Sequence, residues 1–124
     1  MAESIAAQIE REVASWPEVT VETHRFGGRE FRRGRRELGH LHGDRLADLP
    51  FPVRVREQLV QEGKAEPHHI LPESGWVSRP IHGEHDIAEV IALFRMNYDR
   101  PWGSSLPARR SGKRASPRDS RSPP

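Results

Sequence analysis

The stretch Arg36-Glu37-Leu38-Gly39-His40-Leu41-His42-Gly43-Asp44 gathers an arginine, two histidines and acidic residues into nine positions. Its alternation of residue types predicts a β-strand that ends in a glycine turn. Because side chains alternate across a strand, one face should carry Arg36, Leu38, His40 and His42, and the other Glu37, Gly39 and Leu41. Neighbours on one face lie about 6–7 Å apart, so two imidazoles and a guanidinium could converge on one small ligand or ion.

The residues before this stretch predict two further strands. Val19, Val21 and Thr23 alternate with polar residues, and the alternation stops at Gly27-Gly28. Two adjacent glycines supply the positive φ angles of a tight hairpin turn. We therefore expect strands over residues 19–25, 29–33 and 35–42, which form an antiparallel meander.

Helices are predicted on both sides of the meander. Apolar residues repeat at helical spacing over residues 2–15 and again after Asp86, which opens the strongest helical pattern of the chain. Pro52 suits the first turn of a third helix, and Gly63 suits its C-terminal cap. Residues 46–52 are interpreted as too rich in proline for a strand, residues 65–75 as a loop, and residues 76–81 as the last strand.

These elements predict one α+β domain over residues 1–100. The order is α-β-β-β-α-β-α without an internal repeat. We expect an antiparallel four-stranded sheet with the helices packed on one side.

The composition limits the possible classes of protein. The chain has 124 residues, no cysteine, 34% hydrophobic and 31% charged residues and a mean hydropathy of −0.80. The lack of cysteine excludes a disulfide scaffold, a thiolate zinc site and a cysteine nucleophile. No apolar run is long enough to span a bilayer and no signal peptide is recognisable, so we expect a cytoplasmic protein without a membrane partner.

Residues 101–124 differ from the rest of the chain. They carry six arginine or lysine residues against a single aspartate, and the remainder is mostly Ser, Pro and Gly. Such a segment cannot bury enough apolar surface to offset the entropy of ordering it, so a disordered basic tail is expected. The tail and the arginines of residues 32–36 could contact nucleic acid weakly, but a solvated tail is the favoured interpretation.

A second polar patch, residues 66–76, is the natural partner of the histidine face. It contains His68, His69, Ser74 and Trp76 in a segment with two prolines. These four residues are the candidates for binding a small anionic or aromatic molecule, with the indole as a wall of the pocket. In a purely structural interpretation, Ser74 shapes a turn and Trp76 packs in the core.

The histidine face suggests acid–base chemistry. A histidine titrates near neutrality, so His40 or His42 could act as general base while Arg36 holds an enolate or carboxylate. The structural alternative is that these are half-exposed strand residues bonded to their neighbours.

A metal site is the minority hypothesis for the same atoms. His40 and His42 would supply two ligands, and His68 or His69 the third. Glu37 is the poorer third ligand, because the alternation points it to the opposite face.

The string Arg-Glu-Leu-Gly-His-Leu-His at 36–42, the Ser74-Gly75-Trp76 turn and the last helix with Asn97-Tyr98 resemble the luciferase-domain family. This family comprises small bacterial proteins and the fungal luciferases, and the similarity covers residues 35–100. Fungal members oxidise a hydroxypyrone luciferin with molecular oxygen, without flavin or metal. The resemblance thus implies an oxidoreductase that needs no cofactor, with oxygen as co-substrate. The chain differs from the fungal members in lacking their long N-terminal extension and in the loop between His42 and Trp76.

Two hypotheses from different classes remain. The first is a cofactor-independent oxygenase that acts on an enol or hydroxypyrone-like molecule between the His40 face and the 67–76 loop. The second is a noncatalytic module that binds a small ligand in the same place. Nucleic-acid binding, unlike pocket binding, should fall steeply with added salt.

Overall fold

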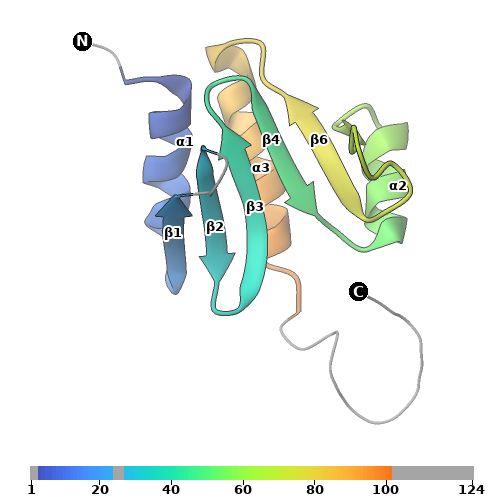
Figure 1. The fold of residues 1–124 in the computed structure, drawn as a ribbon, viewed down its shortest axis with the longest axis horizontal. Coiled ribbons are helices and arrows are strands. Elements are labelled where there is room, and N and C mark those ends of the chain that lie inside the picture. The colour runs from blue at the N-terminus through green and yellow to red at the C-terminus, as the bar shows by residue number, and fades with distance from the viewer. Residues whose placement is uncertain (1–2, 24–26, 102–124) are drawn as a thin grey trace, which may run out of the picture.

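The computed structural model describes residues 3–23 and 27–101 (Figure 1). Almost all of the predicted tail lies outside these residues. The elements follow one another as α1 (Ile5–Ala14), β1 (Val19–Thr23), β2 (Arg29–Arg33), β3 (Arg36–His42), β4 (Leu46–Pro50), α2 (Val53–Gln61), β5 (Glu66–Pro67), β6 (Trp76–Pro80), a 3-10 turn (Glu84–Asp86) and α3 (Ile87–Tyr98).

The strands form one antiparallel sheet in the order β1-β2-β3-β4-β6-β5. The α+β class and the antiparallel sheet are confirmed, and strands form at β1, β2, β3 and β6 as predicted. Residues 24–25 of the first predicted strand lie outside the described residues. The sheet has six strands rather than the predicted four. Both additional strands fall in segments that were not predicted to be strands: residues 46–52, interpreted as too rich in proline, and residues 65–75, interpreted as a loop.

The strand β4 is the more important correction, because it lies between β3 and β6. Ala47 and Leu49 are fully buried and project to the same face of the strand, which packs in the core despite the prolines of the segment. Pro50 is its last residue, where the missing N–H costs the ladder least. The other new strand, β5, is two residues long and pairs only with β6 at the sheet edge.

The helices α1 and α3 pack against each other and cover one face of the sheet (Figure 1). The rings of Phe31 in β2 and Phe94 in α3 lie 5.2 Å apart, as do those of Trp16 and Tyr98. The helix α2 lies next to β5 and β6 (Figure 1). None of the helices within the described residues has the length and apolar character needed to cross a bilayer.

A β-bulge in β3 decides which of its residues face the helices. Phe31 pairs with Gly39, but the next residue of β2 pairs with Glu37, so Leu38 is an extra residue. Leu38 and Leu41 are consequently both buried in the core. A Cβ on Gly39 would lie 3.0 Å from the Phe94 ring. The predicted common face of Leu38 and His40 is therefore wrong.

Asn97 of α3 ties the helix to the bulged strand. It is fully buried, and its side-chain nitrogen donates to the carbonyls of Leu38 (3.0 Å) and Pro50 (2.9 Å). Replacing Asn97 with alanine leaves two buried carbonyls without this donor. We expect the free energy of unfolding to fall by about 1–3 kcal/mol in urea titrations. Met96→Ala, on the exposed side of α3, is the matched control; an equal loss in both variants would contradict the role of Asn97.

Candidate functional site

A row of polar residues crosses the sheet on the face opposite α1 and α3. The members are paired in register from strand to strand: Glu30, His40, Asp48, Ser78 and Glu66. Paired residues of an antiparallel sheet project from the same face. The bulge and the alternation of β4 together bring one histidine and one carboxylate to the centre of this face.

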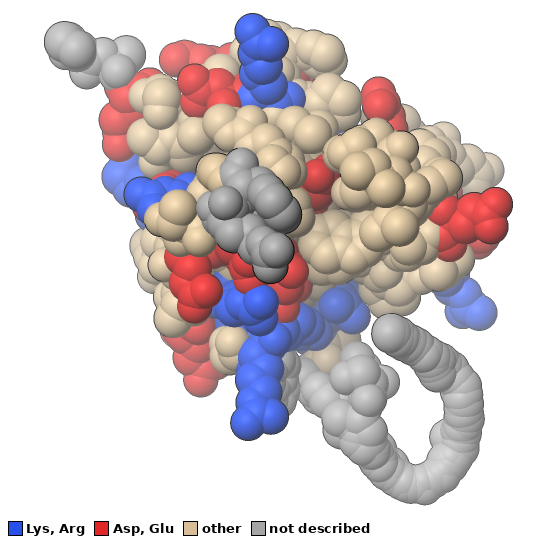
Figure 2. Space-filling view, viewed as in Figure 1, with Lys and Arg blue, Asp and Glu red and all other residues tan. Residues whose placement is uncertain are grey.

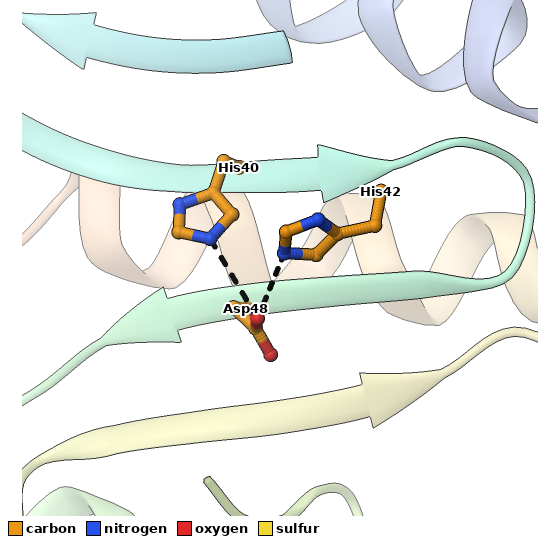
Figure 3. A group of neighbouring side chains, drawn as sticks. All are labelled: His40, His42 and Asp48. Carbon is orange, nitrogen blue, oxygen red and sulfur yellow. Dashed lines mark hydrogen bonds and ion pairs between the residues drawn. The ribbon is translucent and has the colours of Figure 1, made fainter. Parts of the chain in front are cut away.

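Asp48 is the centre of the cluster, and its side chain is only 1% exposed. Its Oδ2 lies 3.0 Å from Nε2 of His42 and 3.6 Å from Nε2 of His40 (Figure 3). It also lies 3.6 Å from Nε2 of His68. Its Oδ1 accepts a hydrogen bond from the Ser78 hydroxyl at 2.7 Å. Three imidazoles and one hydroxyl therefore surround a single buried carboxylate.

The charges of this cluster are mutually dependent. Burial by itself raises the pKa of Asp48, but the contacts with His40 and Ser78 outweigh it and lower the pKa to about 2. Burial likewise lowers the pKa of His40, but Asp48 and Glu37 raise it to about 9. Glu37 accepts from His40 Nδ1 at 2.9 Å, so the predicted orientation of Glu37 away from the histidines is wrong. The reason is again the extra residue at Leu38.

The segment before β6 closes one side of the cluster. The Trp76 ring lies 5.4 Å from the ring of His40 and 6.0 Å from that of His68. Nδ1 of His68 accepts from two backbone N–H groups of the same segment, each at 3.1 Å. In neutral His68 the hydrogen is then on Nε2, which faces Asp48. Burial lowers the pKa of His68, which favours this neutral form.

The structure thus brings together several of the predicted site residues. His69 also reaches the cluster: its ring stacks on His68 at 4.4 Å, and its Nδ1 lies 3.4 Å from the Ser78 hydroxyl. Ser74 instead shapes the turn, since its hydroxyl donates to the Leu71 carbonyl at 2.7 Å and accepts from the Trp76 N–H at 3.1 Å.

Arg36 lies elsewhere. Its guanidinium donates to the carbonyl of Arg100, just beyond α3, at 2.9 Å. The predicted common face of Arg36 with His40 and His42 is wrong, because the bulge interrupts the alternation between them. Burial lowers the pKa of Arg36, and the nearby Arg33 adds to this effect.

Asp48 and Ser78 were not among the predicted site residues. The signal for Asp48 was a single acid among the otherwise apolar residues 46–50, since an acid buried in a strand normally has a polar partner. This signal was missed because the segment was interpreted as too rich in proline for a strand.

The surface around the cluster has an uncharged region and a positively charged region. Figure 2 shows mainly uncharged atoms over β6 and the segment before it, whereas Lys and Arg gather near the turn between β2 and β3. Ile70 and Leu71 of this segment are exposed large apolar residues. The cluster therefore has an apolar neighbour on one side, as a site for an organic ligand requires.

Comparison with known proteins identifies the family. The family model described as Luciferase domain matches residues 35–97, which is about half of the chain. The chain belongs to the luciferase-domain family. The match begins beside β3 and ends in α3, so this luciferase domain includes the whole histidine–carboxylate cluster. Searches of curated proteins and of solved structures found no match.

The two shifted pKa values predict how the stability of this luciferase domain depends on pH in a buffer that contains a chelator. The raised pKa of His40 contributes stability below its ordinary pKa of 6.5, and this is lost as the pH rises towards 9. The lowered pKa of Asp48 contributes stability above its ordinary pKa of 3.8, and this is lost as the pH falls towards 2. Urea midpoints should be highest between these ordinary values.

The variant His40→Gln should remove the decline on the alkaline side, because glutamine does not titrate. His85→Ala changes a histidine whose side chain is 74% exposed and should keep the decline. A wild-type midpoint that stays constant from pH 6.5 to 9 would contradict the raised pKa of His40.

Proposed function

We propose that the protein is a small-molecule oxygenase that acts on an enol or a hydroxypyrone-like compound. The observation that supports it best is the hydrogen-bonded pair of His42 and Asp48, on the face of the sheet opposite α1 and α3 and next to His40, whose ring lies 5.4 Å from that of Trp76. Membership in the luciferase-domain family supports the class of reaction. Arg36 is left out of the proposed site, because its guanidinium contacts the end of α3.

The cluster is suited to proton transfer. Asp48, with its lowered pKa, is an acceptor only, so in the neutral pair Nε2 of His42 donates to it at 3.0 Å. Nδ1 of His42 is then the basic nitrogen, and the side chain is 36% exposed. A histidine held by a buried carboxylate in this way is a common general base.

The proposed reaction needs no further oxidant or reductant. The histidine takes a proton from the enol, and the resulting enolate carbon forms a bond to molecular oxygen. The electron pair of the enolate reduces the oxygen to a bound peroxide, which takes up the proton and becomes a hydroperoxide. All atoms of the substrate and of oxygen are then in the product.

Trp76 and its neighbours support the substrate class. The indole is half-buried between the rings of His40 and His68, where a planar unsaturated ring could stack. His69 belongs to the polar end of the proposed binding surface, and the exposed Ile70 and Leu71 form its apolar end. A flat anion with an apolar substituent fits both parts.

Oxygen uptake in the presence of hydroxypyrones and related enols tests the proposal. His42→Ala removes the base, and we expect the turnover rate to fall by about 100-fold or more. Asp48→Asn should have a similar effect, because the amide can no longer hold the histidine in its basic tautomer. His85→Ala should turn over at the wild-type rate. Ligand binding without any oxygen uptake by the wild-type protein would instead indicate a noncatalytic binding module.

Trp76 provides a separate test of the binding wall. Trp76→Ala should raise the KM for an aromatic enol by about 2–10-fold, which corresponds to the loss of one aromatic pair. Trp76→Phe keeps a ring and should restore most of the affinity. If both variants bind the substrate as the wild type does, the substrate does not contact this side chain.

A further inference from the structure

We infer that His40, His42 and Asp48 form a three-ligand site for a divalent transition-metal ion. One ring nitrogen of each histidine and one carboxylate oxygen lie within 4.8 Å of one another. Two strands supply them: the His-x-His spacing places both imidazoles on one face of β3, and Asp48 faces them from β4 (Figure 3). The inference goes beyond the proposed function: a bound ion would replace the hydrogen that Nε2 of His42 shares with Asp48, so the metal-bound form and the form in which His42 is the base are two separate states of the same residues.

The distances between the atoms match a coordination shell. Ligands at about 2.0–2.2 Å from a tetrahedral metal ion are separated from each other by about 3.3–3.6 Å. Asp48 Oδ2 lies 3.6 Å from His40 Nε2, within that range, and 3.0 Å from His42 Nε2, slightly below it. The His40 and His42 rings are nearly perpendicular, at 89°, which lets both nitrogens point to one place.

The surrounding hydrogen bonds are those that metal ligands normally have. Ligating histidines usually donate their other ring N–H to a carboxylate, and ligating carboxylates are themselves hydrogen-bonded. Nδ1 of His40 contacts Glu37 at 2.9 Å, and Oδ1 of Asp48 accepts from Ser78 at 2.7 Å. Both arrangements hold the lone pairs of Nε2 and Oδ2 towards the common centre.

This hydrogen bonding also suits a positive charge between His40 and Asp48. When Nδ1 of His40 donates to Glu37, Nε2 of the neutral ring is an acceptor and faces the acceptor Oδ2 of Asp48 at 3.6 Å. Two facing acceptors repel each other unless a positive charge lies between them. Without a metal ion, the proton of the His40 imidazolium fills this role. A metal ion would take the place of that proton, with Nε2 of His42 as an additional ligand.

His68 is excluded as a ligand, although it lies close to Asp48. Its Nδ1 accepts two backbone N–H groups, so its Nε2 carries hydrogen and has no lone pair for a metal. With three ligands, positions of the ion remain open for water or substrate, as in sites with two histidines and one carboxylate. Nitrogen ligands favour iron, cobalt or zinc over calcium and magnesium.

Cobalt(II) is the probe for the test, because its visible absorption reports the coordination. Chelator-treated full-length protein is titrated with cobalt(II) by calorimetry and absorption. We expect one ion per chain, with ligand-field bands in the visible spectrum. His42→Ala should bind at least 100-fold more weakly, and Glu37→Gln, which alters only the support of His40, about 10–100-fold more weakly. His85→Ala should bind as the wild type does.

Circular dichroism of each variant verifies that it is folded, and neither His42 nor Glu37 is fully buried. The inference is overturned if cobalt does not bind, or if His42→Ala and His85→Ala bind it equally. If the protein binds no cobalt but consumes oxygen with an enol, the metal site is wrong and the proposed function stands. If it binds one cobalt at these ligands and the protein as purified consumes no oxygen with any enol, the metal site stands and the proposed function is wrong.

Discussion

The β-bulge at Leu38 is the constraint on which the rest of this structure depends. One extra residue in β3 lets Leu38 and Leu41 both enter the core. In a strand without the bulge, residues three positions apart would point to opposite faces of the sheet. Gly39 follows in close contact with α3, where a side chain would not fit. The same extra residue turns Glu37 towards His40 and separates Arg36 from both histidines. The bulge therefore decides which residues of β3 enter the core and which enter the site.

Asp48 shows why a polar cluster can be maintained on this scaffold. A buried carboxylate is costly unless donors surround it, and here Ser78 and His42 provide hydrogen bonds while two further imidazoles lie within 3.6 Å. The central strands β3, β4 and β6 fix these partners at adjacent register positions, and a rigid sheet holds them more accurately than loops would. His68 is the exception, because a turn of the segment before β6 positions it through backbone hydrogen bonds.

Much of the fold could be predicted from local patterns. The spacing of Val90 and Phe94 identified α3, and the glycine pair at 27–28 identified the hairpin. The strand β4 was missed because its proline was taken as evidence against any strand, whereas a proline at the last position is compatible with one. The histidines were recognised as candidate site residues, but Asp48 could not be, since its proximity to them depends on the register between β3 and β4. The bulge is likewise a tertiary feature that strict alternation does not anticipate.

The short strand β5 has a consequence for how this protein behaves at high concentration. An exposed sheet edge offers unpaired backbone groups to other chains, and long flat edges lead to aggregation. At this edge the sheet ends in only two residues, and one of them, Pro67, has no N–H to offer. A strand from a second molecule would find almost no ladder to extend there. The edge next to β6 is thus protected against intermolecular strand addition by the same proline-rich segment that leads into the histidine loop.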